Sequence, residues 1–339
     1  MSRLFLGLDA GGSWTRAVVL DAEGAERGRA LAEGANPTGQ GDQGAVRRLA
    51  EAAVAALGGL DPGAVAGAAV GLAGYRALTD PAGFAERCRT AFGLDAPVLL
   101  CPDAVTAFAS GTDAAEGTVL IAGTGAACSR VSGHQVLRVS GGLGWLLGDE
   151  GSGFWLGREA LRRAYAEPDG PLGRAVLRHC GARRPAELLP WAYAGPPRRL
   201  AQLAPLVNTA AAQGDRTALA VAAAGAGQLA ALVRATAAHG PLVLAGSVAG
   251  APGAVRERLL ELLADYGPIH PAGDPAAAAA RLAGAPPQCA SRTQLGPTPV
   301  GPTPSAPTPV GQRPPAPTPV GQRPTGPGTA VGQGPGRDG

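Results

Sequence analysis

The stretch Gly7-Leu8-Asp9-Ala10-Gly11-Gly12-Ser13-Trp14-Thr15-Arg16 sets the expectation for the whole fold. An apolar run over residues 4–8 ends at an acid, two glycines and a hydroxyl residue follow, and a second apolar run begins at residue 17. Adjacent glycines let successive backbone N–H groups point into one concavity, which suits phosphate. Ser13 adds a hydroxyl donor, and Asp9 can hold a hydrated Mg2+, an ion that keeps most of its waters. The stretch therefore predicts a phosphate-binding turn between two strands.

The chain repeats this pattern at Val119-Leu120-Ile121-Ala122-Gly123-Thr124-Gly125, again followed by two strand-like runs, 126–131 and 135–139. Between the two copies, the apolar run 97–100 leads into Cys101-Pro102-Asp103. A later apolar run, 242–245, ends at Gly246-Ser247 before a predicted helix. Two glycine turns that face each other with an acid between them resemble the nucleotide clamp of sugar kinases, Hsp70 and actin.

Composition excludes several other classes of protein. The chain has 339 residues and contains no lysine, so all 29 basic residues are arginine. A Walker-type phosphate loop and a protein-kinase ATP site both need a lysine, so neither is present. The net charge of +3 comes with scattered arginines, which gives no reason to expect nucleic-acid binding.

The cysteines and histidines indicate neither disulfides nor a metal centre. The five cysteines are widely spaced without a Cys-x-x-Cys motif, and the four histidines lack metal-ligand spacing. This usage fits a reducing cytoplasm. No apolar run reaches membrane-spanning length, so we expect a soluble, cytoplasmic protein without a membrane partner.

The predicted elements follow one order twice. In the first half they are three strands within 3–33, a loop at 34–39, a helix from Asp42 to Leu57, a strand at 65–72, a helix around 84–92, a strand at 98–100 and a helix capped by Asp103 that runs to Ala109. In the second half they are three strands within 118–140, helices over 154–239, a strand at 242–245, a helix at 253–264, a strand at 268–270 and a helix at 275–282.

This order predicts an α/β protein with a duplicated ribonuclease H-like fold, the fold of actin, Hsp70 and hexokinase. We expect two domains, 1–108 and 109–273, around a nucleotide cleft, with a helical insertion in the second. The last helix, 274–284, should pack back onto the first domain. Residues 286–339 repeat Pro-Thr-Pro-Val-Gly three times and have almost nothing apolar to bury, which predicts a disordered tail.

The stretch from Gly141 to Arg158 is the most distinctive after the two turns. It contains glycines, two tryptophans and the acid pair Asp149-Glu150, and it opens into a helix at Ser152. Apolar residues and glycines can shape the faces of a sugar, and a carboxylate accepts hydrogen bonds from sugar hydroxyls. We therefore expect this loop to bind an acceptor.

Taken together, the motifs resemble the N-acetylglucosamine kinase family, which belongs to the BadF/BadG/BcrA/BcrD-type ATPases of the ASKHA superfamily. The motifs that carry the resemblance are Gly7-x-Asp9-x-Gly11-Gly12-Ser13, Pro102-Asp103-Ala104, Ala122-Gly123-Thr124-Gly125 and Leu147-Gly148-Asp149-Glu150-Gly151-Ser152-Gly153-x-Trp155. The resemblance spans roughly residues 3–283 and excludes the tail.

The resemblance implies a kinase that uses ATP and Mg2+, with Asp103 as the general base for the sugar 6-hydroxyl and Asp9 holding Mg2+ through water. The residues expected at the ATP are Gly11, Gly12, Ser13, Gly123, Thr124, Gly125, Gly214 and Gly246. The residues expected at the sugar are Asn36, Asp103, Gly142, Gly144 and Asp149. Ala126, Ala127 and Leu143 would supply apolar walls for an acetamido group. The expected partners are a small amino sugar and ATP. A homodimer is compatible with the resemblance, which does not decide the oligomeric state.

Two departures from the family pattern bear on which sugar is bound. Thr38 stands where the family has an aromatic residue, and Ala126-Ala127 replaces a pair that is often polar. The acceptor we expect is N-acetylglucosamine, with glucosamine and N-acetylmuramic acid as alternatives. A nucleotide-dependent switch ATPase on the same fold is the non-kinase alternative, because it needs the same glycine turns.

Overall fold

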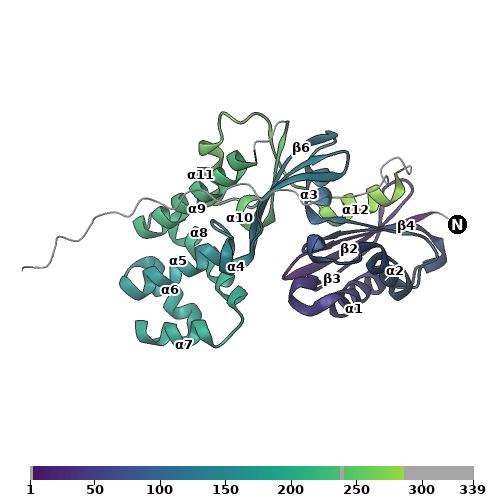
Figure 1. The fold of residues 1–339 in the computed structure, drawn as a ribbon. Helices are drawn as coiled ribbons and strands as arrows, with labels where there is room; N and C mark the ends of the chain where they lie inside the picture. Colours follow the sequence, from purple (N-terminus) through teal and green to yellow (C-terminus); the bar gives the residue numbers. More distant parts are fainter. Residues whose placement is uncertain (1–2, 237–239, 286–339) are drawn as a thin grey trace, which may run out of the picture. The chain divides into compact units, whose positions relative to one another are not determined.

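The computed structural model describes residues 3–236 and 240–285 (Figure 1). These residues all belong to one compact unit of the chain. The expected disordered tail lies outside the described residues, as does the predicted end of the helical region at His239.

The first sheet has five strands in the order β3-β2-β1-β4-β5. Its strands are β1 (Leu4–Ala10), β2 (Trp14–Asp21), β3 (Glu26–Glu33), β4 (Val65–Leu72) and β5 (Val98–Pro102). The hairpins β1–β2 and β2–β3 are antiparallel, whereas β4 runs parallel to both β1 and β5. The ends of β1, β4 and β5 therefore meet at one edge of the sheet.

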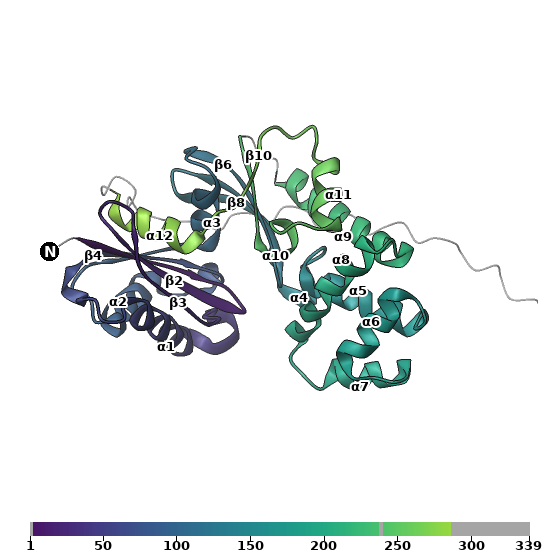
Figure 2. The ribbon, with the colours of Figure 1, turned by 180° about the vertical axis from the view of Figure 1, so that it is seen from behind.

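Helices cover both faces of this sheet (Figures 1 and 2). On one face, α1 (Pro37–Leu57) and α2 (Pro81–Phe92) form a core with the buried side chains of β1 and β4. On the other face, α12 (Pro275–Gly284) packs Ala276 and Ala280 against Val18 and Leu20. This close approach requires Gly7 in β1, because a β-carbon there would collide with the backbone of α12.

The second sheet repeats the order of the first, as β8-β7-β6-β9-β10. Its strands are β6 (Glu116–Ala122), β7 (Ala126–Ser132), β8 (Gln135–Gly141), β9 (Leu242–Ala245) and β10 (Ile269–Pro271). It too joins two antiparallel hairpins to strands that run parallel. The duplicated ribonuclease H-like fold predicted from the sequence is therefore confirmed.

The helices of the second half contribute most of its core. They are α4 (Gly144–Leu147), α5 (Gly153–Ala166), α6 (Pro171–Cys180), α7 (Leu188–Tyr193), α8 (Ala204–Ala212), α9 (Arg216–Ala235), α10 (Gly246–Ala249) and α11 (Ala254–Leu262). Between the two halves runs α3 (Asp103–Gly111), whose Ala107 and Phe108 pack with Val119 and Val243 of the second sheet. Thus α3 starts at the end of β5 and packs on both sheets.

Two predicted helix starts differ from the structure. A first helical turn begins α1 before Asp42, because Asn36 accepts a hydrogen bond from the Thr38 N–H and Pro37 occupies that turn, while the helix after the kink at Gly41 is the one predicted from Asp42 to Leu57. Gly41 interrupts that helix with a φ of 70°, which accounts for the later start read from the sequence. Asp103 is the first residue of α3 rather than its cap, since Pro102 holds the cap position.

We expected no apolar run of membrane-spanning length, and α9 contradicts this. By length and composition alone, α9 is long and apolar enough to cross a membrane. In the structure 44% of its most apolar window is buried. One face of α9, including Val221, Leu229 and Val233, lies in the core of the second half. A core helix of this kind meets the same length and composition criteria as a membrane span, so the finding is weak evidence for a membrane.

Candidate functional site

The two glycine turns face each other directly. The first turn links β1 to β2, the second links β6 to β7, and the Ser13 Oγ lies 3.0 Å from the Thr124 Oγ1. Each hydroxyl belongs to a turn of the same construction, one from each half of the chain. The structure therefore brings together the two expected phosphate contacts, which are 111 positions apart in the chain.

The first turn rests on the segment that follows β3. The Gly34 N–H donates to the Ser13 carbonyl oxygen over 3.0 Å, and within the turn the Gly11 N–H donates to the Trp14 carbonyl over 2.9 Å. A β-carbon at Gly34 would collide with the Gly12 carbonyl, so only glycine lets the segment lie this close. The same segment leads to Asn36, which ties the expected sugar contact to the first turn.

The second turn is held by the start of α5. The Gly153 N–H donates to the Gly123 carbonyl over 2.7 Å, and the Phe154 N–H donates to the Thr124 carbonyl over 3.1 Å. In a planar trans peptide the N–H of the next residue points away from the carbonyl. The N–H groups of Thr124 and Gly125 therefore point away from α5, as a turn that binds an anion requires.

The acids Asp9 and Asp103 stand at the ends of β1 and β5, the two strands that flank β4. Asp9 pairs across the sheet with Gly71 of β4, and Gly71 pairs with Cys101 of β5, two residues before Asp103. The missing side chain of Gly71 makes room for Thr106 of α3, whose hydroxyl donates to the Asp103 carbonyl over 3.0 Å. This close fit seats the start of α3 beside the end of β1.

Both acids hold their protons more tightly than usual. Burial raises the pKa of Asp9 to about 6, against the opposing effect of Arg16, and the charge of Asp274 adds to the rise. Burial raises the pKa of Asp103 to about 6 as well, and the negative charge of Asp9 contributes. A pair of carboxyl groups with raised pKa values in one place is typical of a functional site.

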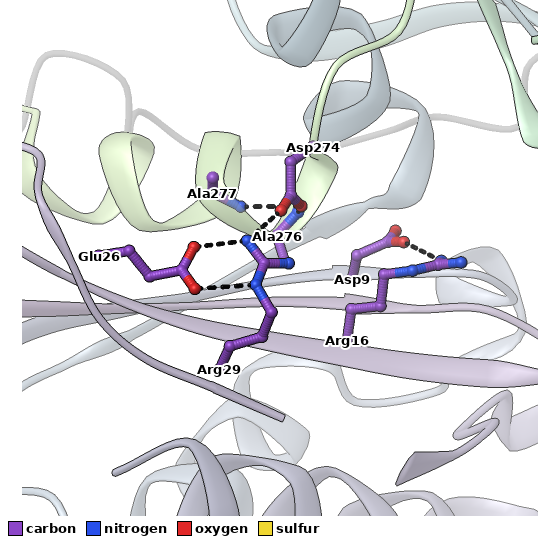
Figure 3. A network of polar contacts seen from close by, with 7 residues as sticks. All are labelled: Asp9, Arg16, Glu26, Arg29, Asp274, Ala276 and Ala277. Atoms are coloured by element: carbon purple, nitrogen blue, oxygen red, sulfur yellow. Dashed lines mark hydrogen bonds and ion pairs between the residues drawn. The ribbon is translucent and has the colours of Figure 1, made fainter. Parts of the chain in front are cut away.

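Two groups of ion pairs lie beside each other on the first sheet, one with Asp9 and one with Asp274 (Figure 3). The Arg16 Nη1 lies 3.5 Å from the Asp9 carboxylate, across the β1–β2 hairpin. Arg29 of β3 binds Asp274 at 2.7 Å and Glu26 at 2.6 Å. Asp274 also caps α12, accepting from the Ala276 N–H over 2.9 Å. The ion pairs of Arg29 therefore hold the start of α12 on the first sheet, close to Asp9.

The carboxylate of Asp9 is suited to hold a hydrated Mg2+ as its single protein ligand. Asp9 is 16% exposed, and negative charge from Asp274 reaches it. In the part of the chain that the structure describes, no group of three or more Asp, Glu, His or Cys side chains can enclose a metal. A cation here would keep most of its waters and take further ligands from phosphates, which is the usual arrangement for Mg2+.

Most of the expected sugar contacts from the second half lie together around the second turn. Asp149 Oδ1 accepts from the Ala126 N–H over 3.0 Å, and the Gly142 N–H donates to the Ala126 carbonyl over 2.9 Å. A β-carbon at Gly142 would lie 3.3 Å from that of Ala127. Leu143, which follows, is 41% exposed. A β-carbon at Gly144, in the same loop, would meet no atom within 4 Å.

The expected nucleoside contacts separate into two places. Gly246 lies against the second turn, because a β-carbon there would be 2.8 Å from the Gly123 nitrogen. Gly214 lies between α8 and α9, and its neighbour Asp215 caps α9 and accepts from the Leu172 N–H over 2.7 Å. The contacts beside Gly214 are made with α6 and not with either glycine turn. Of the two expected nucleoside contacts, Gly246 is therefore the better supported.

Sequence reasoning missed Arg16, Arg29, Asp274 and Gly34. Arg16 had a signal, because it lies opposite Asp9 when the strands pair around a turn at 11–14. Asp274 also had one, since an acid before proline is typical of a helix start. No signal in the sequence indicated the contacts of Arg29 with Asp274 or of Gly34 with the first turn, because these partners come from distant segments.

Comparison with known proteins gives a family match. Residues 6–283 match the model of the BadF/BadG/BcrA/BcrD ATPase family. This match includes both glycine turns, Asp9, Asp103 and the start of α5, and it leaves out the tail.

Individual relatives are also similar. The chain is 28% identical to the N-acetyl-D-glucosamine kinase of Dictyostelium discoideum over 62% of this chain and 72% of that protein. It is 32% identical to the N-acetylmuramic acid/N-acetylglucosamine kinase of Clostridium acetobutylicum, over 30% of this chain and only 32% of that protein. A crystal structure from Chromobacterium violaceum, described as a candidate N-acetylglucosamine kinase, superposes with a TM-score of 0.66 at 25% identity, covering 83% of this chain and 99% of that one.

Proposed function

The chain belongs to the BadF/BadG/BcrA/BcrD ATPase family, and from this premise we propose that it is an ATP-dependent kinase that phosphorylates the 6-hydroxyl of N-acetylglucosamine. The observation that carries the proposal is the meeting of the two glycine turns, whose hydroxyls lie 3.0 Å apart. The names of its similar proteins support an amino sugar as acceptor.

In the proposed reaction the two turns bind the phosphates of ATP. Ser13 and Thr124 would each donate a hydroxyl hydrogen bond, and the N–H groups that point away from α5 would add further donors. Gly246, packed against the second turn, would let the nucleoside approach the backbone. In phosphoryl transfer such positioning and charge stabilisation account for most of the catalysis.

Asp103 would act as the general base. Its carboxylate would accept the proton of the sugar 6-hydroxyl, while the hydroxyl oxygen bonds to the γ-phosphorus and the bond to the β–γ bridging oxygen breaks, releasing ADP. A pKa of about 6 leaves Asp103 ionised at neutral pH yet a better proton acceptor than an ordinary aspartate. Mg2+ bound near Asp9 would neutralise charge on the β- and γ-phosphates.

The choice of acceptor rests on the walls around the second turn. A free amino sugar is cationic near neutral pH and would need a carboxylate beside its 2-position. Asp149 directs one oxygen to Ala126, and its neighbour Glu150 is exposed. Ala127, which is half-buried, and Leu143, which is exposed, offer apolar surface that suits an acetamido methyl group instead. The expected wall at Ala126 is not available, because that side chain is buried in the core of the second half.

N-acetylmuramic acid is the second candidate acceptor. Thr38 lies near Gly74 and is exposed, where an aromatic side chain would have covered the sugar. The missing ring would leave space for a substituent on the 3-hydroxyl. The partial similarity to a kinase named for both sugars supports keeping this candidate. One lost hydrophobic contact changes discrimination by about 1–3 kcal/mol, so some activity on both sugars is expected.

Initial rates with ATP across N-acetylglucosamine, N-acetylmuramic acid, glucosamine and glucose test this proposal. We expect kcat/KM to be highest for N-acetylglucosamine. A tenfold preference for glucosamine would refute the acetamido argument and point to Glu150 as the ammonium partner. ATP hydrolysis at one rate with or without every sugar would favour a nucleotide-switch ATPase instead.

We also propose that the protein acts in the cytoplasm on ATP and a small sugar, with no nucleic-acid or membrane partner. The scattered arginines support this placement, as do the four cysteines within residues 3–236, which are all free thiols. Sedimentation of the purified protein, with and without ATP, distinguishes a monomer from a homodimer.

A further inference from the structure

We propose that Asp149 is a positioning residue for the phosphate-binding turn at Gly123-Thr124-Gly125, and that it thereby couples the acceptor loop to the nucleotide site. This inference rests on the proposed function, because it assumes that the turn binds phosphate. It goes beyond a sugar contact: Asp149 would matter for nucleotide binding even when no sugar is present.

The carboxyl group of Asp149 is directed at the turn itself. Its Oδ1 accepts a hydrogen bond of 3.0 Å from the N–H of Ala126, the residue that follows the turn. The carboxyl also lies against Gly125, where a β-carbon would be 2.9 Å from both carboxylate oxygens. The Asp149 side chain thus holds the turn at its last residue and fills the space beside it.

The burial and backbone of Asp149 indicate that this contact is selected rather than incidental. The residue is only 8% exposed and has no ion-pair partner among the described residues, which is unusual for an acid. Its φ is 63°, in the left-handed region that glycine enters most easily. A non-glycine residue there costs about 1 kcal/mol or more, in a loop rich in glycine. The side chain must therefore contribute something that glycine lacks.

The same loop anchors the turn at two further points. After Asp149, the Ser152 N–H donates to the Asp149 carbonyl over 3.1 Å, which leads the chain into α5. The first N–H groups of α5 then bind the carbonyls of Gly123 and Thr124. Asp149 adds the third anchor, just after the end of the turn, through Ala126. Both ends of the turn are therefore fixed by residues 149–154.

This arrangement links the two substrates physically. Asp149 Oδ1 is engaged by the turn, which leaves Oδ2 to accept from a sugar hydroxyl if the sugar binds as proposed. A sugar that orders the loop would also order the phosphate turn, so each substrate should tighten the binding of the other. The expected coupling is modest, because it passes through one hydrogen bond and the start of one helix.

The test measures binding of AMPPNP with Mg2+ by calorimetry, without sugar, in four proteins. Asp149→Gly removes the carboxylate without backbone strain, because glycine tolerates the positive φ. Asp149→Asn keeps an oxygen that can accept from the Ala126 N–H, and asparagine also tolerates this φ. Glu150→Gly is the matched control, since it removes the neighbouring negative charge and adds a glycine to the same loop.

We expect Asp149→Gly to weaken AMPPNP binding by about five- to tenfold, the effect of one lost anchoring hydrogen bond. Asp149→Asn and Glu150→Gly should stay within about twofold of wild type. A wild-type affinity in Asp149→Gly, together with a raised KM for the sugar, would overturn the inference and leave a simple sugar contact. Failure of the wild-type protein to bind AMPPNP would instead refute the proposed function, and the inference with it.

A second measurement covers the case in which Asp149→Gly does not fold. A neutral amide oxygen is a weaker acceptor than a carboxylate, so Asp149→Asn should exchange the Ala126 amide hydrogen faster than wild type. Amide exchange followed by NMR or by mass spectrometry of peptides that span 123–128 reports this rate. Equal exchange in the two proteins would contradict a positioning bond from Asp149.

Discussion

Replacing Asp103 by asparagine is expected to stabilise the protein and nearly abolish its activity. Burial, followed by the charge of Asp9, raises the pKa of Asp103 from 3.8 to about 6. An acid with a higher pKa in the folded state binds its proton more tightly there, so the folded protein loses stability as this acid ionises. Asparagine carries no charge and escapes this loss.

The size of the effect follows from the shift. A rise of about two pKa units corresponds to about 3 kcal/mol at 1.36 kcal/mol per unit. Below the ordinary value of 3.8 the folded and unfolded states are both protonated and nothing is lost. The loss grows as pH rises from 3.8 to 6 and is constant above. About 1 kcal/mol of it falls between pH 5 and pH 8 by this relation.

Urea unfolding of the metal-free protein at pH 5 and pH 8 measures this difference. The free energy of unfolding of Asp103→Asn, relative to wild type, should rise by about 1 kcal/mol from pH 5 to pH 8. Any cost of satisfying the new amide, about 1–3 kcal/mol, is the same at both pH values and cancels. An unchanged difference between the two pH values would refute the burial of an ionised Asp103.

Activity of the same variant tests the proposed role of Asp103. Loss of a general base lowers kcat by about two to four orders of magnitude, while AMPPNP affinity should change little. In the wild-type protein kcat/KM should fall as pH drops through about 6, because protonated Asp103 cannot accept the proton. A variant with activity within threefold of wild type would show that Asp103 is not the base.

Three further changes have expected outcomes. Gly34→Ala should weaken AMPPNP binding about tenfold, because its β-carbon displaces the first turn, whereas Gly39→Ala, which meets no atom within 4 Å, should match wild type in calorimetry. Arg29→Gln should lower the free energy of unfolding in urea by about 1 kcal/mol, a small value because the arginine is half-exposed. An unchanged free energy would show that the ion pairs of Arg29 do not stabilise the fold. A chain of residues 1–285 should keep full activity and melting temperature, whereas residues 1–273, which lack α12, should melt far lower or aggregate; an active, stable 1–273 chain would contradict the packing of α12 on the first sheet.

The fold could be predicted because its signals are local and occur twice. Each half starts with an apolar strand, a glycine turn and a second strand, and the strand orders of the two sheets correspond. The first helix was predicted less well, since Gly41 has a φ of 70° and separates one turn of helix from the rest. Glycine at that point reads as a loop, although the cap at Asn36 starts the helix before it.

The candidate site could be predicted only in part. The turn residues and Asp103 follow strands, so their place at a sheet edge is a consequence of order along the chain. The contacts that hold the site in shape come from elsewhere in the chain. Asp149 reaches Ala126, and Arg29 reaches Asp274, only after the chain has folded. No periodicity or motif in the sequence pairs such distant residues.

Phosphorus NMR of one reaction tests the central claim most directly. The purified protein is mixed with ATP, Mg2+ and N-acetylglucosamine, and the products are followed with time. The proposed kinase predicts ADP and N-acetylglucosamine 6-phosphate in equal amounts, with the new phosphorus signal coupled to the two hydrogens on carbon 6. ADP with free inorganic phosphate and no sugar phosphate would contradict it.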